Sequence, residues 1–219
     1  MKHILRIPSS DDYSRTLPVL SRREALPPRA VGFDDGPSTT KNSAKSRICR
    51  AALVGAWFHG FRLHAVSIGL LTVDGLDVTD TILNIVKRSR VEVIFLSGAS
   101  FAGFNIIDSR KLHRTLGIPA IVVSRDKPDN AAVRCALKKH FADWKTRWRL
   151  VRELGRIHTY APMLSEEPLY FETVGLPAGA AKKIIRGYCG TSRIPEPIRV
   201  AGLLGRGFAP SGDELHSSR

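Results

Sequence analysis

The sequence of 219 residues has few cysteines, no long hydrophobic run and a shortage of acidic residues. Its three cysteines, Cys49, Cys135 and Cys189, are widely spaced, which favours reduced thiols over a disulfide framework. The longest apolar stretch, residues 63–73, is too short to span a bilayer, and residues 1–30 lack the continuous apolar core of a signal peptide. We therefore expect a cytoplasmic protein that makes no use of a membrane.

Several familiar site chemistries are also missing from the sequence. The seven histidines show no spacing with cysteine that is typical of a zinc site, and no pairing with serine or cysteine that would make a nucleophile. There is no glycine-rich loop of the P-loop or dinucleotide-binding type. We therefore expect no organic cofactor, and carboxylates are the main candidates for chemistry.

Basic residues dominate the charge of the chain. The 34 lysines and arginines outnumber the 20 acidic residues and give a formal net charge of +14, with an isoelectric point near 10.3. A field of this sign attracts polyanions, and nucleic acid is the commonest polyanion in a cell. The charge does not distinguish DNA from RNA. The hydrophobic content of 43% is that of an ordinary globular protein.

The sequence divides into one domain and two terminal segments. Residues 1–29 contain four prolines and no sustained period, so we expect an N-terminal extension that is mobile or loosely docked. Residues 30–208 carry the strand and helix patterns of a single domain. Residues 209–219 are polar and form a C-terminal tail.

Hydrophobic periodicity predicts a mixed α/β sheet flanked by helices. The first three strands are expected to be antiparallel, since His59 and Gly60 make a tight turn between the second and the third. A strand, a helix and a second buried strand then follow in the order of a parallel unit. In chain order we expect strands at 30–35, 48–60, 61–75, 91–98, 118–125 and 168–176, and helices at 78–90, 108–117, 130–155, 177–190 and 197–208.

The long helix expected at residues 130–155 has an apolar stripe, which we interpret as core, and a strongly basic remainder. A charged helical face is either solvated or available to phosphates, and the net charge favours neither alternative alone. The residues we take as candidates for nucleic-acid binding are Lys138, Lys139, Arg147 and Arg149.

Acidic residues follow the ends of several expected strands. Asp34 and Asp35 come after the first strand, Asp74 and Asp77 come after the third, and Asp108 opens a helix. Ligands bind where strand ends meet at one edge of an open α/β sheet. Oxygen ligands at such an edge favour Mg²⁺ or Mn²⁺. Because neighbouring strand residues face opposite ways, we expect Asp34 to bind the metal and Asp35 to support it.

Each of these acids also has an ordinary structural explanation. Asp77 and Asp108 precede helices and are suited to N-cap positions. Asp74 and the pair Asp34 and Asp35 precede glycines, which is usual in turns. The sequence leaves both explanations open, although several coincident turns and caps are less expected than one.

The segment SGASFAGFN at residues 97–105 is rich in small residues, with two phenylalanines between them. Small residues let the backbone approach a ligand closely, and an aromatic ring there can stack on a base extruded from a duplex. A compact structural loop is the alternative. The candidates for a base pocket are Ser97, Gly98, Phe101, Gly103, Phe104 and Asn105.

Three segments carry a resemblance to a known family. They are VGFDDGPS, TVDGLDVTDTI and LSGASFAGFNIIDSRKLHRTLGIPAIVVSRDKPD. The chain from residue 30 to residue 208 resembles the archaeal endonuclease dU family, which is similar to endonuclease V. This resemblance implies a ribonuclease-H-like fold and a magnesium-dependent endonuclease that acts on deaminated bases, with deoxyuridine in DNA as the foremost substrate and DNA repair as the context.

Relatives of the endonuclease V type have one acid at the end of the first strand, a second after the third strand and a third at the end of the next strand. Asp34 and Asp74 match the first two positions and are implied as catalytic, metal-binding residues. Ser97 occupies the third position. The resemblance therefore implies that Asp108 or Asp77 reaches the metal, that fewer ions bind, or that the activity is weak.

Two other classes of function remain open. One is a nucleic-acid-binding protein with the same fold and no catalysis, which the serine at position 97 favours. The other is an enzyme for a small nucleotide or phosphate compound. The oligomeric state is left open, as is the choice between DNA and RNA.

Overall fold

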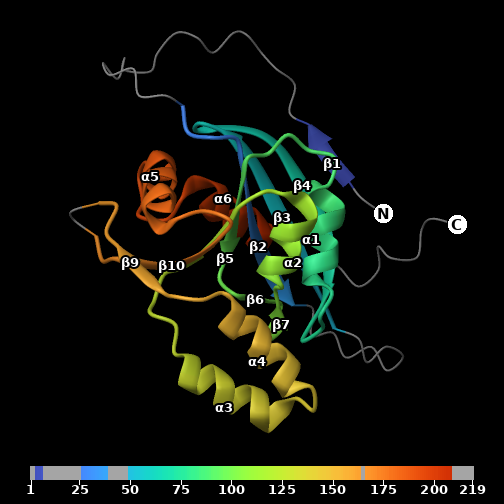
Figure 1. The fold of residues 1–219 in the computed structure, drawn as a ribbon. Helices are drawn as coiled ribbons and strands as arrows, with labels where there is room; N and C mark the ends of the chain where they lie inside the picture. Colours follow the sequence, from blue (N-terminus) through green and yellow to red (C-terminus); the bar gives the residue numbers. More distant parts are fainter. Residues whose placement is uncertain (1–2, 7–25, 39–48, 164–165, 209–219) are drawn as a thin grey trace, which may run out of the picture.

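A computed structural model describes residues 3–6, 26–38, 49–163 and 166–208 (Figure 1). Its strands are β1 (His3–Arg6), β2 (Ala30–Ser38), β3 (Arg50–His59), β4 (Arg62–Thr72), β5 (Val93–Ser97), β6 (Ser100–Phe101), β7 (Asn105–Ile106), β8 (Ala120–Ser124), β9 (His158–Tyr160) and β10 (Leu169–Val174). Its helices are α1 (Val78–Val86), α2 (Ser109–Leu116), α3 (Asn130–His140), α4 (Trp144–Glu153), α5 (Ala178–Tyr188) and α6 (Glu196–Gly207).

The main sheet has the strand order β1-β4-β3-β2-β5-β8-β10-β9 among the described residues. Strands β2, β3 and β4 are antiparallel, β2 pairs in parallel with β5, and β5 pairs in parallel with β8. Strand β10 then runs antiparallel to β8. The expected mixed α/β sheet, antiparallel first and parallel afterwards, is confirmed. Strands β6 and β7 form a separate two-stranded hairpin.

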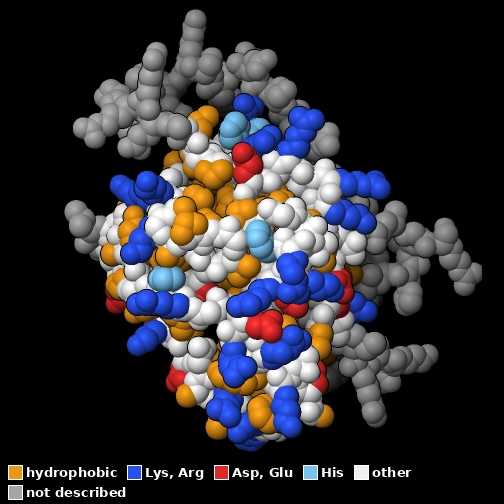
Figure 2. Space-filling model, viewed as in Figure 1, with side chains coloured by type: hydrophobic (Ala, Val, Ile, Leu, Met, Phe, Trp, Pro, Cys, Tyr) orange, Lys and Arg blue, Asp and Glu red, His pale blue; other side chains and the backbone are white. Residues whose placement is uncertain are grey.

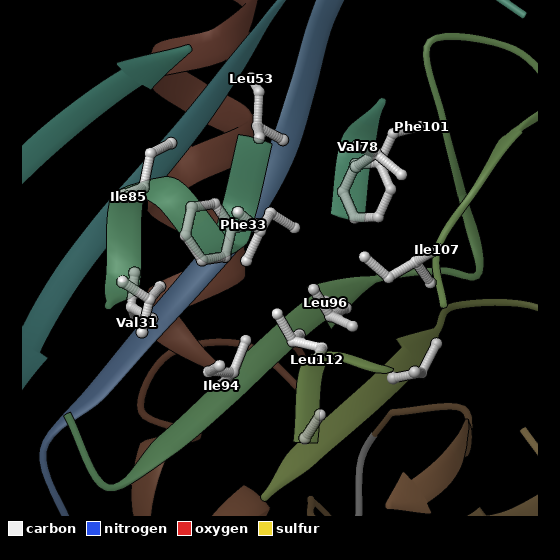
Figure 3. Close-up of a cluster of buried hydrophobic side chains, with 14 of the residues drawn as sticks. Val31, Phe33, Leu53, Val78, Ile85, Ile94, Leu96, Phe101, Ile107 and Leu112 are labelled. Atoms are coloured by element: carbon white, nitrogen blue, oxygen red, sulfur yellow. The ribbon is translucent and has the colours of Figure 1, made fainter. Parts of the chain in front are cut away.

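Helices cover both faces of the main sheet, and the alternation of side chains along β2 separates the two cores. Val31 and Phe33 face the first core, where α1 and α2 pack (Figure 3). Ala30 faces the second core, which includes side chains of α5 and α6. In the part of the chain that the structure describes, no helix is long and apolar enough to cross a membrane.

Helices α3 and α4 form a helical hairpin at the lower end of the molecule, close to β6 and β7 (Figure 1). The prediction of a single helix at residues 130–155 is therefore wrong. Phe141 has an extended backbone and ends α3, although no glycine or proline marks the break. The extended residue lets the Phe141 ring pack edge-on against Phe104, with 5.4 Å between ring centroids.

Part of the expected N-terminal extension belongs to the sheet. Residues His3–Arg6 pair with β4 as an antiparallel edge strand, so this piece of residues 1–29 is not loosely docked. Residues 7–25 and the C-terminal tail at 209–219 lie outside the described residues. Strand β9, which the sequence pattern does not predict, pairs with the other side of β10.

The backbone of β2 lies directly against that of α6. A Cβ atom added to Gly32 would lie 2.2 Å from the carbonyl carbon of Pro197, and one added to Gly36 would lie 2.4 Å from the carbonyl oxygen of Gly205. Gly202 of α6 also faces β2 closely, since a Cβ atom added there would lie 2.3 Å from a carboxylate oxygen of Asp34. Glycine is needed at these positions because no side chain fits between the two elements.

The substitution Gly32→Ala should lower the free energy of unfolding by about 1–3 kcal/mol, because its methyl group would force α6 away from β2. Urea denaturation measures this change. Gly179→Ala on α5 is the matched control, since nothing lies within 4 Å of the added methyl and alanine favours a helix. A Gly32→Ala protein as stable as the control would contradict the backbone contact.

Candidate functional site

Asp34 lies in the middle of β2, directly after the last residue that pairs with β5, on the face covered by α6. Its Oδ1 accepts a hydrogen bond from the backbone N–H of Asp35 at 3.0 Å, and the Ser97 side chain on the neighbouring strand β5 also hydrogen-bonds to it. Burial and the negative charge of Asp35 raise the pKa of Asp34 to about 6. The ionised carboxylate is therefore held where a nearby positive charge would stabilise it.

Asp35 and Asp74 hold the tip of the β6–β7 hairpin. Asp35 points to the opposite face of β2 from Asp34, and its Oδ2 accepts the backbone N–H of Ala102 at 2.6 Å. Asp74, in the turn after β4, accepts the backbone N–H of Phe104 at 2.8 Å and donates its own N–H to the carbonyl of Ala102 at 2.9 Å. The two acids thus fix Ala102 and Phe104 from β2 and from the turn after β4.

The junction between Asp74 and the hairpin tip has an uncommon backbone. Asp74 has a φ of 58° and Ala102 a φ of 44°, and no other non-glycine residue among those described has a positive φ. Gly103 has a φ of 84°, and a Cβ there would lie 2.3 Å from Asp74 Oδ1. Such strain persists only where the surroundings enforce it, and it is frequent at functional sites.

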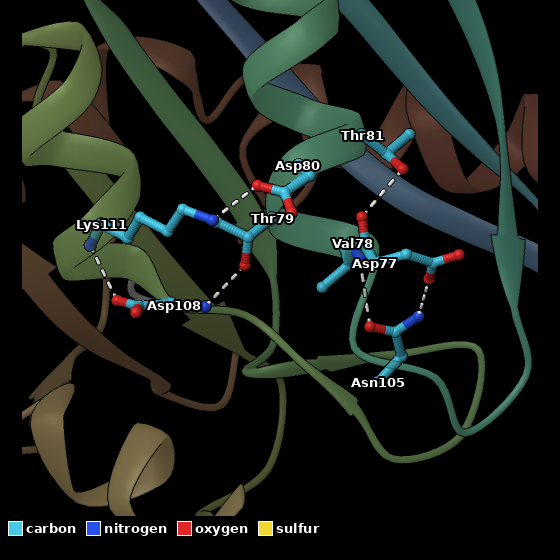
Figure 4. A network of polar contacts seen from close by, with 8 residues as sticks. All are labelled: Asp77, Val78, Thr79, Asp80, Thr81, Asn105, Asp108 and Lys111. Atoms are coloured by element: carbon cyan, nitrogen blue, oxygen red, sulfur yellow. Dashed lines mark hydrogen bonds and ion pairs between the residues drawn. The ribbon is translucent and has the colours of Figure 1, made fainter. Parts of the chain in front are cut away.

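Asp77 and Asp108 take part in a structural network (Figure 4). The Asp77 carboxylate accepts hydrogen bonds from the Thr72 hydroxyl at 2.8 Å and the Asn105 amide at 2.6 Å. Asp108 caps α2 by accepting the backbone N–H of Lys111 at 2.7 Å, so the N-cap role predicted from its position before a helix is confirmed. Asp77 occupies the N-cap position of α1, but its side chain makes no capping bond.

The acids expected at one edge of the sheet do not form a ready-made cluster. Across the described ranges, no three His, Cys, Asp or Glu side chains gather in a way that could hold one metal ion. Asp34 lies against α6, Asp74 against the hairpin tip and Asp77 against Asn105. A metal bound at Asp34 would need further ligands from water or substrate.

A cavity of about 430 Å³ opens beside the carboxyl ends of β5 and β8. Of the residues expected in a base pocket, Ser97, Gly98 and Phe104 line it. The other three do not line it. Phe101 is buried in the core, Asn105 supports the network of Asp77, and Gly103 is packed against Asp74.

The cavity also contains residues that the sequence patterns did not single out. Val133 of α3, Val151 of α4 and Leu154 directly after α4 form part of its wall. The exposed Arg125 and Lys127 lie in the loop after β8, and Glu172 of β10 is buried. One signal could have revealed Glu172. It is an acid in the middle of an apolar strand, where a sheet covered on both faces offers no water.

The four basic residues proposed for nucleic-acid binding do not share one environment. Lys138, Lys139 and Arg149 are exposed on α3 and α4, where lysine and arginine side chains gather at the lower end of the visible face (Figure 2). Arg147 is only 6% exposed, so its assignment as a phosphate contact is corrected. Its guanidinium donates to the carbonyls of Gly75 at 2.9 Å and Phe104 at 2.7 Å.

Arg147→Ala should lower the free energy of unfolding by about 2–4 kcal/mol, because it leaves Asp143 and two partly buried carbonyls without their donor. Arg149→Ala, which loses only an exposed pair with Glu153, should change it by less than about 0.5 kcal/mol. Urea denaturation of both proteins tests the contrast. Equal losses would argue against a structural role for Arg147.

The pKa of Asp34 predicts a dependence of stability on pH. Because the folded pKa, about 6, lies above the ordinary value of 3.8, the folded state holds the proton more tightly than the unfolded chain. This proton therefore stabilises the fold at pH 4, and the stabilisation is lost as the pH rises to 6. In the presence of a chelator, the free energy of unfolding of Asp34→Asn should equal that of the wild type at pH 4. At pH 7 it should be higher by up to about 3 kcal/mol, which urea denaturation measures. A difference in free energy of unfolding between the two proteins that is the same at both pH values would contradict the raised pKa.

Comparison with known proteins places this chain among archaeal relatives. The family model described as Endonuclease dU matches residues 28–209. A UPF0215 protein of Methanothermobacter thermautotrophicus is 39% identical over 184 residues, which cover 82% of this chain and 86% of the relative. A protein of unknown function from Archaeoglobus fulgidus, known from its crystal structure, is 28% identical with a TM-score of 0.68, over 81% of this chain and 95% of the other.

The fold extends to a second group of solved structures. Endonuclease V of Ciona intestinalis, in complex with a 24mer DNA that contains an inosine followed by a ribo-adenosine, has a TM-score of 0.50 at 14% identity, over 80% of this chain and 82% of the other. At that identity the likeness concerns the fold alone. The family match covers most of the chain, including β2, the hairpin tip and the cavity. The chain therefore belongs to the endonuclease dU family and has an endonuclease V-like fold.

Proposed function

We propose that this protein is a magnesium-dependent or manganese-dependent endonuclease that cuts DNA at deaminated bases, with deoxyuridine as its lesion, and so serves DNA repair. Membership of the endonuclease dU family supports a nuclease. The observation that carries the proposal is the position of Asp34, a half-buried carboxylate of β2 that is hydrogen-bonded to Ser97, a residue of the cavity wall. The endonuclease V of Ciona intestinalis, solved with DNA, supports DNA as the partner.

The donor set around Asp34 fits a hard divalent cation. Burial and the adjacent Asp35 penalise the negative charge of Asp34, and a cation would remove that penalty. Mg²⁺ typically uses one or two protein carboxylates and completes its shell with waters and substrate phosphates. Asp34 would hold the ion with the Ser97 hydroxyl beside it. The cation would neutralise charge on a phosphodiester and lower the pKa of a bound water.

The remaining residues of the site position the DNA. Asp35 and Asp74 keep the β6–β7 tip rigid, so that Phe104 is held at the rim of the cavity. An extruded base enters the cavity at lower cost when its pairing is already weakened by deamination. Arg125, Lys127, Lys138, Lys139 and Arg149 are exposed and provide positive charge for the phosphate backbone.

A non-catalytic DNA-binding protein is the second candidate, and one observation favours it. Ser97 lies at the strand end where the endonuclease V pattern has an acid, and no three-ligand cluster forms among the described residues. A serine hydroxyl is a weaker ligand for Mg²⁺ than a carboxylate. Such a protein would recognise the lesion and leave the strand intact.

One assay separates the two candidates. Duplexes with a single uracil, hypoxanthine or xanthine are incubated with Mg²⁺ or EDTA, and the ends of the products are mapped. The wild type should nick the uracil duplex only with the metal, and Asp34→Asn should reduce nicking at least 100-fold, the usual scale for a lost catalytic group. Asp80→Asn, which removes an exposed acid paired with Lys111, is the control and should nick normally.

Binding measurements complete the test. Asp34→Asn should bind the uracil duplex about as well as the wild type, since the DNA contacts lie elsewhere. Mg²⁺ should raise the melting temperature of the wild type and leave that of Asp34→Asn unchanged, because a ligand stabilises only the protein that binds it. Wild-type protein that binds these duplexes and cuts none of them would favour the non-catalytic candidate.

A further inference from the structure

Glu172 is a buried acid that the proposed cleavage chemistry does not use. It lies in the middle of β10, opposite Val122 of β8, and is only 5% exposed. Its Oε2 is buried and has no hydrogen-bond partner, one of two such side-chain atoms among the described residues. A buried carboxylate oxygen without a partner is costly, so its presence here needs an explanation.

The free oxygen belongs to a side chain that lines the cavity. Val122, the partner of Glu172 in the sheet, lies in the same core as Leu154, and Leu154 lines the cavity together with Glu172, Val151 and Val133. Burial raises the pKa of Glu172 to about 7, and no cation contributes to that shift. The cavity thus combines an apolar wall with one strong hydrogen-bond acceptor, which is the usual composition of a small-ligand site.

We propose that Glu172 determines which base this cavity accepts, by taking a hydrogen bond from the ring N–H of a lactam nucleobase such as uracil. The proposal rests on the proposed function for the nature of the substrate, and it adds the residue that recognises the lesion. Phe104, in the hairpin tip, is an aromatic residue that lines the same cavity.

The chemistry of deamination explains why an acceptor is suitable. Cytosine carries an unprotonated ring nitrogen at position 3, and this nitrogen accepts hydrogen bonds. Deamination to uracil replaces the exocyclic amine by a carbonyl and places a proton on that nitrogen, which becomes a donor. A carboxylate only accepts hydrogen bonds, so it pairs with the N–H of uracil and repels the lone pair of cytosine. A site with a buried acceptor rejects a ligand that leaves the acceptor unpaired.

The hydrogen bonding of Glu172 differs from that of a buried carboxylate with a structural role. A buried carboxylate that stabilises a fold accepts hydrogen bonds with both oxygens or pairs with a cation. Glu196 does this in the same protein, where both of its oxygens accept hydrogen bonds from Arg199. Glu172 instead has one buried oxygen without a hydrogen-bond partner, on a side chain that lines the cavity.

Free nucleosides test the proposal without any need for cleavage. Saturation-transfer NMR at pH 8.5, above the pKa of Glu172, is used to titrate the wild-type protein with 2′-deoxyuridine, N3-methyl-2′-deoxyuridine and 2′-deoxycytidine. Deoxyuridine should bind at least tenfold more tightly than the other two, and Glu172→Met should lose this preference. Glu167→Met, the same change at an exposed position, should keep it.

The stability of the variant separates recognition from structure. Glu172→Met fills the same space without a buried charge, so its melting temperature at pH 8.5 should equal or exceed that of the wild type. Equal binding of deoxyuridine and its N3-methyl derivative, no binding of any nucleoside, or an unchanged preference in Glu172→Met would each overturn the proposal. Normal nicking of uracil duplexes alongside any of these results would leave the proposed function intact and reject the role of Glu172 alone.

Discussion

The backbone contact between β2 and α6 decides where the acids of the site lie. Because glycines at 32 and 36 bring the helix against the strand, Asp34, the first carboxylate after the core residues of β2, lies against Gly202 and is half-buried. The next residue, Asp35, faces the other side of the strand and is free to bind the hairpin tip. A single strand thus gives two adjacent aspartates different surroundings, one against α6 and one at the hairpin tip.

The hairpin tip joins three otherwise separate parts of the molecule. Asp35 reaches it from β2, Asp74 from the turn after β4, and Arg147 from α4 through the carbonyl of Phe104. These bonds tie the helical hairpin of α3 and α4 to the edge of the sheet, and the cavity lies between them. The positive φ values of Asp74 and Ala102 are the local cost of that junction.

The sequence predicts those features that depend on local pattern. Strand alternation places Asp34 and Asp35 on opposite faces, and the position of Asp108 before a helix predicts its capping bond. Features that depend on distant partners are not predictable in this way. The break at Phe141 follows from a ring contact with Phe104, and the burial of Arg147 follows from carbonyls that lie 72 and 43 residues away. A basic residue in a helix is expected to be exposed, and nothing within α4 indicates the exception.

The raised pKa values of Asp34 and Glu172 are informative because the protein as a whole is strongly basic. With a net charge of +14, a carboxylate on the surface would be stabilised, yet the pKa values of Asp34 and Glu172 are raised to about 6 and 7. Burial outweighs the favourable field at both positions, so each acid lowers the stability of the empty protein at neutral pH. Acids whose ionised forms are disfavoured in the free state gain most from a ligand that supplies the missing partner. A divalent cation at Asp34 and an N–H donor at Glu172 would be two such partners, and the electrostatic penalty at each position then becomes binding energy.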